Sequence, residues 1–121
     1  MLVVNRFVVP AEGPAGEEFV ERATAALGAL AASRGYVRGE LGRAYDDPAH
    51  WSLVTEWESV GAYRRALGGF DVKVHATPLL AQSIDEPSAY EVLARSGADG
   101  AVTTATSDRA ADGDRAPRTR P

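Results

Sequence analysis

The chain has 121 residues, a length that fits a single domain, and 45% of them are hydrophobic, which is enough for a globular core. The net charge of −4 argues against a nucleic-acid binder, because such proteins need a basic face. The absence of cysteine excludes disulfides, thiolate metal sites and cysteine nucleophiles. No apolar run approaches the roughly 18 residues of a membrane span, and no signal peptide is visible, so we expect a cytoplasmic protein.

The first expected element is a strand over residues 2–9, "LVVNRFVV", which Pro10 ends. Its centre holds two polar residues, Asn5 and Arg6. Because strand side chains alternate between faces, Asn5 is expected to point toward the helices and Arg6 toward the opposite face. A buried Asn amide bonds either nearby backbone or water, or it reaches a ligand. A buried arginine needs a carboxylate. The candidates are Glu40, Glu56, Glu58 and Glu91.

A helix is predicted over residues 12–35. Pro14 suits its first turn, and Glu17 and Glu18 favour the positive end of the helix dipole. Gly35 is the expected stop signal. Apolar side chains recur at helical spacing through this segment. They are Phe19, Ala23, Leu27, Leu30 and Ala31.

Two strands are expected next, over residues 36–45 and 51–58, joined by a turn at residues 46–50. The two glycines of the earlier strand suggest a β-bulge. His50, in the turn, is expected to be exposed. The later strand alternates, and one of its faces consists of Trp51, Leu53, Thr55 and Trp57.

The second helical region is predicted in pieces. Ser59 caps a helix over residues 60–67, and a Gly-Gly pair then interrupts it. Asp71 is expected to cap a further turn, and Thr77 to begin another one that contains a proline. A last strand is predicted over residues 88–94.

The resulting order is β-α-β-β-α-β, an α+β, ferredoxin-like fold whose second helix is broken. Two helices cover one face of such a sheet and leave the other face open. That second face also carries apolar residues, among them Val4, Val8, Val54 and Val92. Packing two sheets face to face would cover it, so we expect a homodimer.

The composition changes near Ser96. From there to Pro121 the chain has no aromatic residue and no Leu, Ile or Phe, and its acidic and basic residues balance. A segment with so little apolar surface cannot offset its ordering entropy. We therefore expect a folded domain at residues 1–95 and a disordered tail at residues 96–121.

The "TEWES" step that leads into the "AYRRAL" helix, within a ferredoxin-like domain of this size, resembles the antibiotic biosynthesis monooxygenase family. The resemblance covers the whole expected domain. It implies a dimeric α+β barrel with a pocket between sheet and helices. It also implies an oxygenase, either one that needs no cofactor and acts on an electron-rich aromatic, or one that degrades haem.

A narrower likeness, in "VVNRFVVPAEGP" and "TEWESVGAYRRALGGFDVKVH", is to the bacterial haem-degrading enzymes that ruffle their haem. The strand Asn of those enzymes corresponds to Asn5, and their haem-ligating His to His75. Their ruffling Trp position falls on Ala66. The resemblance thus implies catalytic roles for Asn5 and His75, with His75 as the iron ligand if haem binds. His75 could instead act as a base, or it could simply pair with Asp71.

The other candidate site residues are expected to line a pocket for a flat aromatic ligand, although aromatic side chains of this kind also form cores. Two alternatives to a monooxygenase remain: a non-catalytic dimer that binds haem or another small molecule, and a dimerisation module without a ligand. The expected partners include neither nucleic acid nor membrane, and no metal site other than haem iron is expected. The candidate substrate-binding residues are Phe7, Trp57, Tyr63, Ala66 and Phe70.

Overall fold

The computed structural model describes residues 1–107, and the chain divides into two units. The larger unit runs from Met1 to Tyr90, and the smaller begins at Glu91. This boundary lies a few residues before the expected domain end at residue 95. Each unit is described by itself.

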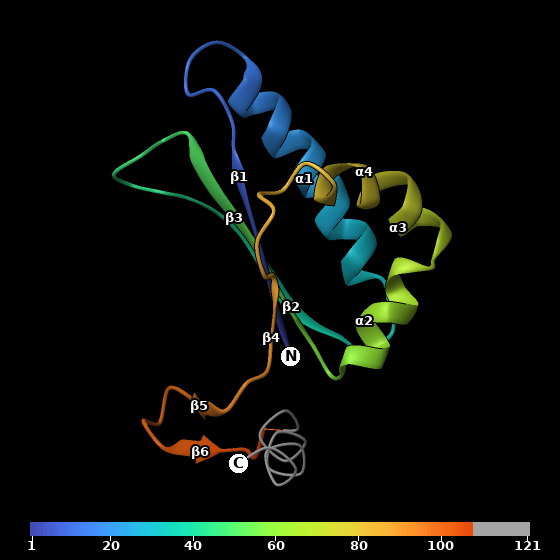
Figure 1. The fold of residues 1–121 in the computed structure, drawn as a ribbon, viewed down its shortest axis with the longest axis vertical. Helices are drawn as coiled ribbons and strands as arrows, with labels where there is room; N and C mark the ends of the chain where they lie inside the picture. The colour runs from blue at the N-terminus through green and yellow to red at the C-terminus, as the bar shows by residue number, and fades with distance from the viewer. Residues whose placement is uncertain (108–121) are drawn as a thin grey trace, which may run out of the picture. The chain divides into compact units, whose positions relative to one another are not determined.

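The larger unit has the expected β-α-β-β-α-β order, with its second helical region in three pieces. Helices α1 to α4 all lie on one side of the sheet (Figure 1). This confirms the α+β, ferredoxin-like prediction. The elements are β1 (Leu2–Val8), α1 (Ala15–Ala31), β2 (Tyr36–Arg43), β3 (His50–Trp57), α2 (Val60–Leu67), α3 (Phe70–His75), α4 (Thr77–Leu80) and β4 (Ala89–Tyr90).

The sheet of this unit has four strands in the order β2-β3-β1-β4, with antiparallel neighbours. Along β1, buried residues alternate with more exposed ones, and Asn5 falls in the buried set opposite Leu53 of β3. Arg6, opposite Ser52, points to the other face. The alternation expected from the sequence is therefore confirmed for both residues.

Helix α1 packs its apolar stripe on the sheet, with Phe19, Ala23, Ala26 and Leu30 buried. Two acidic residues in its first turn complement the helix dipole. The helix is shorter than expected at both ends, because it begins after Pro14 rather than at residue 12 and ends at Ala31 rather than at Gly35. Its small inner residues let the helix backbone lie close to the strands.

Glycines at the start of β2 allow close approaches between backbone segments. Gly35 has φ of +89°, and a Cβ there would collide with the Cβ of Ala62. A Cβ at Gly39 would meet the Tyr36 hydroxyl at 2.6 Å. The register of β2 against β3 shifts between Tyr36 and Arg38, ahead of the two strand glycines. The expected irregularity thus occurs next to Val37.

The break in the second helical region is where the sequence placed it. The Ser59 hydroxyl accepts a hydrogen bond of 3.0 Å from the Ala62 amide and caps α2, and Gly68 ends that helix. Gly69, in an extended conformation, precedes α3. The expectation that Asp71 caps this piece is wrong, because Asp71 lies inside the first turn of α3.

The last strand of the sheet is much shorter than the expected 88–94. Only Ala89 and Tyr90 pair with β1, so Val92 does not belong to the sheet's open face. The Ile84 amide donates to the Arg6 carbonyl and the Val4 amide to the Ser88 carbonyl, each at 2.7 Å. The segment before β4 therefore continues along β1 without forming a full strand.

In the smaller unit, β5 (Ala94–Ser96) and β6 (Val102–Thr104) form an antiparallel hairpin. Gly100, with φ of +80°, lies in its turn, where the Ala101 amide also donates to Asp99 at 3.0 Å. This differs from the expected disorder of the tail from Ser96, because local turn chemistry pairs two short strands of low apolar content. The rest of the expected tail, residues 108–121, lies outside the described residues.

The sheet face opposite the helices combines apolar and charged side chains. Arg6 forms a two-pronged ion pair with Glu86, with Nε–Oε1 and Nη2–Oε2 distances of 2.8 and 3.1 Å. None of the four expected carboxylates is this partner, because the loop before β4 brings Glu86 alongside β1. The expected candidate Glu56 instead accepts from Arg38 at 3.0 Å.

Candidate functional site

Asn5 lies at the centre of the sheet face that the helices cover. Its neighbours on the same face of β1 are Val3 and Phe7, and Leu53 lies opposite on β3. Asn5 is only 9% exposed. Its side-chain amide has both a donor and an acceptor, so it can bind a ligand oxygen or a water.

One aromatic cluster lies on the side of Asn5 that is nearer the N-terminal end of β1. The Trp57 ring contacts the Tyr36 ring at 5.5 Å and the Tyr63 ring at 5.3 Å between centroids. The Trp57 indole N–H donates to the Thr55 hydroxyl at 2.9 Å, which fixes the ring. Burial raises the pKa of Tyr63 above its ordinary value of 10.0, so its phenol stays a donor at neutral pH. We call Tyr36, Trp57 and Tyr63 the lower aromatic cluster.

A second cluster lies toward the other end of β1. The Phe19 ring contacts Phe7 at 5.0 Å and Trp51 at 5.3 Å, so α1 and both central strands meet there. Arg43 lies over the Trp51 ring, 4.8 Å from its centroid. We call Phe7, Phe19 and Trp51 the upper aromatic cluster. Asn5 is thus the polar residue between two aromatic groups on one buried surface.

Two of the expected pocket residues, Ala66 and Phe70, differ in how deeply they are buried. Ala66 is buried on the inner side of α2, where a larger side chain would have to displace its neighbours. Phe70, the first residue of α3, is 80% exposed. Phe70 therefore does not line the buried surface around Asn5.

His75, the last residue of α3, is exposed. It borders a depression of about 310 Å³ between α3 and α1, whose other walls are Asp71 and small residues of α1. Asn5 is not among the residues that line this depression. Asn5 and His75 therefore do not share this depression.

Sequence reasoning placed Trp51 in the core and assigned no role to Arg43. Both residues line a depression of about 370 Å³ at the N-terminal end of α1. They also border a second one of about 300 Å³ that includes His50 and Arg6. The His50 imidazole lies 3.1 Å from the Asp47 carboxylate, so it is tied to its own turn. The only sequence signal for this region was an arginine at the end of one strand and a tryptophan at the start of the next.

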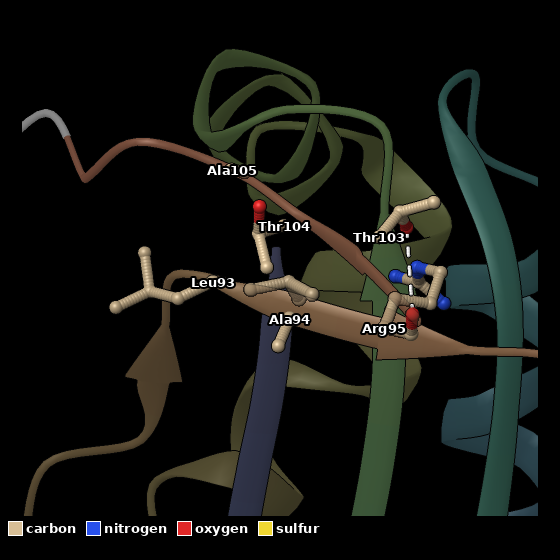
Figure 2. Close-up of a pocket in the computed structure, with 7 residues that line it drawn as sticks. Leu93, Ala94, Arg95, Thr103, Thr104 and Ala105 are labelled. Atoms are coloured by element: carbon tan, nitrogen blue, oxygen red, sulfur yellow. Dashed lines mark hydrogen bonds between the residues drawn. The ribbon is translucent and has the colours of Figure 1, made fainter. Parts of the chain in front are cut away.

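The hairpin unit has a depression of its own, of about 200 Å³. Figure 2 shows its walls, which come from both strands and include Leu93, Arg95 and Thr103. The Thr103 hydroxyl donates to the Arg95 carbonyl at 3.4 Å, so this polar pair serves the hairpin itself. None of the expected site residues lies in this depression.

Residues 1–107 contain no group of three or more His, Asp or Glu side chains placed to hold a metal ion. Within the same residues, no helix is long and apolar enough to cross a membrane.

The fold and sequence have clear relatives. SnoaB from Streptomyces nogalater, described as a cofactor-independent oxygenase, is 33% identical over 76% of this chain and 94% of its own, with a TM-score of 0.59. A single-residue variant of SnoaB is 34% identical over 69% of this chain and 82% of its own, also at 0.59. A conserved protein from Methanosarcina mazei Go1, 18% identical over 73% of this chain and 84% of its own, shares the fold with a TM-score of 0.57.

No curated protein matches the chain in sequence. A family model does match, over residues 1–75, which span β1 to α3 and include both nominated catalytic residues. That match and the SnoaB similarity agree with the observed fold. The chain belongs to the antibiotic biosynthesis monooxygenase family.

Proposed function

We propose that this protein is a monooxygenase that needs no cofactor, and that it oxidises a planar, electron-rich aromatic bound against the buried sheet face around Asn5. The observation that carries the proposal is the buried Asn5 amide between two aromatic clusters. Similarity to SnoaB, described as a cofactor-independent oxygenase, supports the reaction class. His75 is exposed whereas Asn5 is buried, which favours this proposal over haem degradation.

The reaction requires the substrate to be its own reductant. A methylene group activated by an adjacent carbonyl and flanking rings loses a proton to a base, and the resulting enolate gives its electrons to O₂. One oxygen atom becomes the new carbonyl, and the other leaves as water with the two methylene hydrogens. The four electrons taken from the carbon balance the four that O₂ accepts. No metal or flavin is needed.

Asn5 contributes by binding the oxygen on which the enolate charge develops. Its amide N–H₂ can donate to that oxygen, and a donor aimed at a developing charge in a buried site stabilises the transition state. Tyr63 is a second donor, because burial keeps its phenol protonated. Trp57, held by Thr55, supplies a fixed ring for a flat substrate to pack against.

Substrate access requires motion, because Asn5 is covered in this conformation. The break between α2 and α3 at Gly68 and Gly69 gives the two helices separate ends at this point. We propose that α2 or α3 shifts away from the sheet to admit the substrate. His75 would then lie on the moving segment, and its predicted role as a base stays a prediction.

We also propose that the protein is a homodimer that buries the sheet face opposite the helices. On this face Leu2, Val4 and Val54 are only partly covered within one chain, and Val8 is 58% exposed. Arg6 and Glu86 border these residues with a satisfied ion pair. Val54→Asp should convert a dimeric elution mass into a monomeric one. A wild-type chain that elutes as a monomer at micromolar concentration would contradict the dimer.

Oxygen uptake with anthrone tests the enzymatic proposal. Chelator-treated protein without added flavin or haem should consume one O₂ per anthraquinone formed. Asn5→Leu keeps the branched shape of the side chain and removes the amide, and we expect kcat to fall about 10²–10³-fold, as when one oxyanion donor is lost. Gln82→Leu, the same amide-to-apolar change at an exposed position, is the matched control and should retain activity.

Three results would count against this proposal. Uptake that appears only after haem is added would favour the haem alternative, and a Soret shift that His75→Ala abolishes would identify the ligand. A full rate in Asn5→Leu would exclude the assigned role of Asn5. If neither anthrone nor a hydroquinone is turned over, the result would favour the non-catalytic binding alternative.

A further inference from the structure

We propose that a second binding site, for a small organic monoanion with an apolar body, lies where the N-terminus of α1 meets Trp51 and Arg43. It occupies the depression of about 370 Å³ at the upper aromatic cluster. The proposal does not depend on the oxygenase function, because Asn5 does not line this depression.

The Trp51 indole nitrogen is the first observation. Trp51 is only 7% exposed, and in the described part of the chain its Nε1 is the one buried side-chain polar atom without a hydrogen-bond partner. A buried tryptophan N–H usually has a partner, since leaving it unpaired is unfavourable. The lower cluster shows the normal case, where Trp57 donates to Thr55. A ligand oxygen would supply the partner that Trp51 lacks.

Gly16 shows that this edge of the indole faces the depression. A Cβ placed on Gly16 would lie 3.9 Å from Trp51 Cζ2 and 3.9 Å from Arg43 Nη2. Cζ2 and Nε1 are on the same edge of the indole ring. The missing side chain of Gly16 therefore leaves room beside Cζ2, the ring atom next but one to Nε1, and beside the guanidinium group.

The charged groups around the depression favour a ligand with a single negative charge. Arg43 uses Nε to donate to the Pro48 carbonyl at 2.7 Å, and its Nη2 reaches the space beside Gly16. The first turn of α1 adds positive potential, because Pro14 provides no side-chain cap for its free N–H groups. Glu17 also lines the depression and disfavours a second negative charge. Val20 and Ala11 supply apolar walls.

Arg43 is the side chain that can open the site. It is long and exposed, and it rests on the Trp51 ring at 4.8 Å. In this conformation the indole N–H of Trp51 is not accessible to solvent. A carboxylate that pairs with the guanidinium would draw Arg43 aside and leave one of its oxygens within reach of Nε1.

Benzoate, titrated into ¹⁵N-labelled full-length protein, tests the site. The chain has two tryptophans, so its spectrum should show two indole N–H signals, and Trp51→Phe identifies one of them. We expect the Trp51 signal to move downfield and to saturate. The Trp57 signal, already bonded to Thr55, should stay in place and serves as the internal reference.

Three comparisons make the test specific. Arg43→Gln should weaken benzoate about tenfold or more, as expected for loss of a charge-assisted hydrogen bond. Gly16→Val should also abolish the shift, because its methyl groups occupy the space beside Cζ2. Gly28→Val, on the same helix with no atom within 4 Å of its Cβ, is the matched control and should bind normally.

Two ligand controls accompany these variants. Benzamide has the same shape without the charge, and acetate has the charge without the ring, so both should bind more weakly than benzoate. A Trp51 signal that stays still at saturating benzoate would overturn the site. Benzamide binding as well as benzoate would overturn its selectivity for an anion, and acetate binding equally well would overturn the apolar requirement.

Discussion

The two aromatic clusters differ in how completely they are closed. In the lower cluster the Trp57 indole is hydrogen-bonded, and adjacent glycines leave no room for even one added carbon. In the upper cluster the Trp51 indole is unpaired, and Gly16 leaves open space beside it. The same residue type on the same strand thus serves packing at one end and leaves a free donor at the other. Burial alone does not distinguish these two roles, whereas the partner of the indole N–H does.

The largest effect is expected from Gly35→Ala at the lower end. Gly35 has a positive φ, and its new Cβ would collide with Ala62. We expect a loss of about 3 kcal/mol in the free energy of unfolding, from backbone strain and overpacking together. The matched control is Gly13→Ala, which has φ of +75° but nothing within 4 Å. Urea denaturation should show about 1 kcal/mol for the control, and equal losses would mean that crowding at Gly35 contributes nothing.

The next effect compares the two tryptophans directly. Trp57→Phe removes a satisfied hydrogen bond and leaves the buried Thr55 hydroxyl without its donor, so we expect a loss of about 2 kcal/mol. Trp51→Phe removes an unpaired donor and should change stability by less than about 1 kcal/mol. Thermal unfolding followed by circular dichroism measures both. A loss for Trp51→Phe that equals or exceeds the loss for Trp57→Phe would contradict the expected difference between the two indoles.

Gly16→Ala should be stabilising, in contrast to Gly35→Ala. The new Cβ makes ordinary contacts with Trp51 and Arg43, and Ala is the better helix former by about 0.5–1 kcal/mol. Gly28→Ala on the same helix meets nothing within 4 Å and isolates the propensity term. Chemical denaturation of both variants gives the comparison. A destabilised Gly16→Ala beside a stabilised Gly28→Ala would show that the upper end is less open than the structure indicates.

The smallest effect is a pH dependence at the lower end. Burial raises the pKa of Tyr63 in the folded state above 10.0, so the unfolded chain loses this proton first. Stability is therefore fully present below pH 10 and falls as the pH rises through the folded pKa. Tyr63→Phe should flatten this alkaline loss in denaturation curves. An unchanged slope would mean that Tyr63 titrates normally.

Local patterns predicted most of the fold. The alternation in β1 and β3, the Ser59 cap and the Gly68–Gly69 break all follow from side-chain period and backbone chemistry, and the structure confirms them. The short β4 and the Arg6–Glu86 pair were missed, because both depend on where an irregular loop meets β1. No periodic pattern encodes such a long-range contact.

The site was less predictable than the fold. Asn5 was identified because one polar residue interrupts an apolar strand face, and its burial agrees with that reasoning. His75 and Phe70 were assigned to the site from their spacing along the second helical region. The breaks in that region change which way each piece faces, and both residues are exposed. The unpaired indole of Trp51 has no sequence signal, because a hydrogen-bond partner is a property of the packed structure.

The pieces α3 and α4 have six and four residues, too few to be stable as isolated helices. They hold their shape mainly through a few buried residues, Val72, Ala76 and Leu79. Backbone amides here should therefore exchange with solvent faster than those of α1, whose seventeen residues carry four buried side chains. Hydrogen exchange would then show this segment opening by local unfolding while the sheet stays intact.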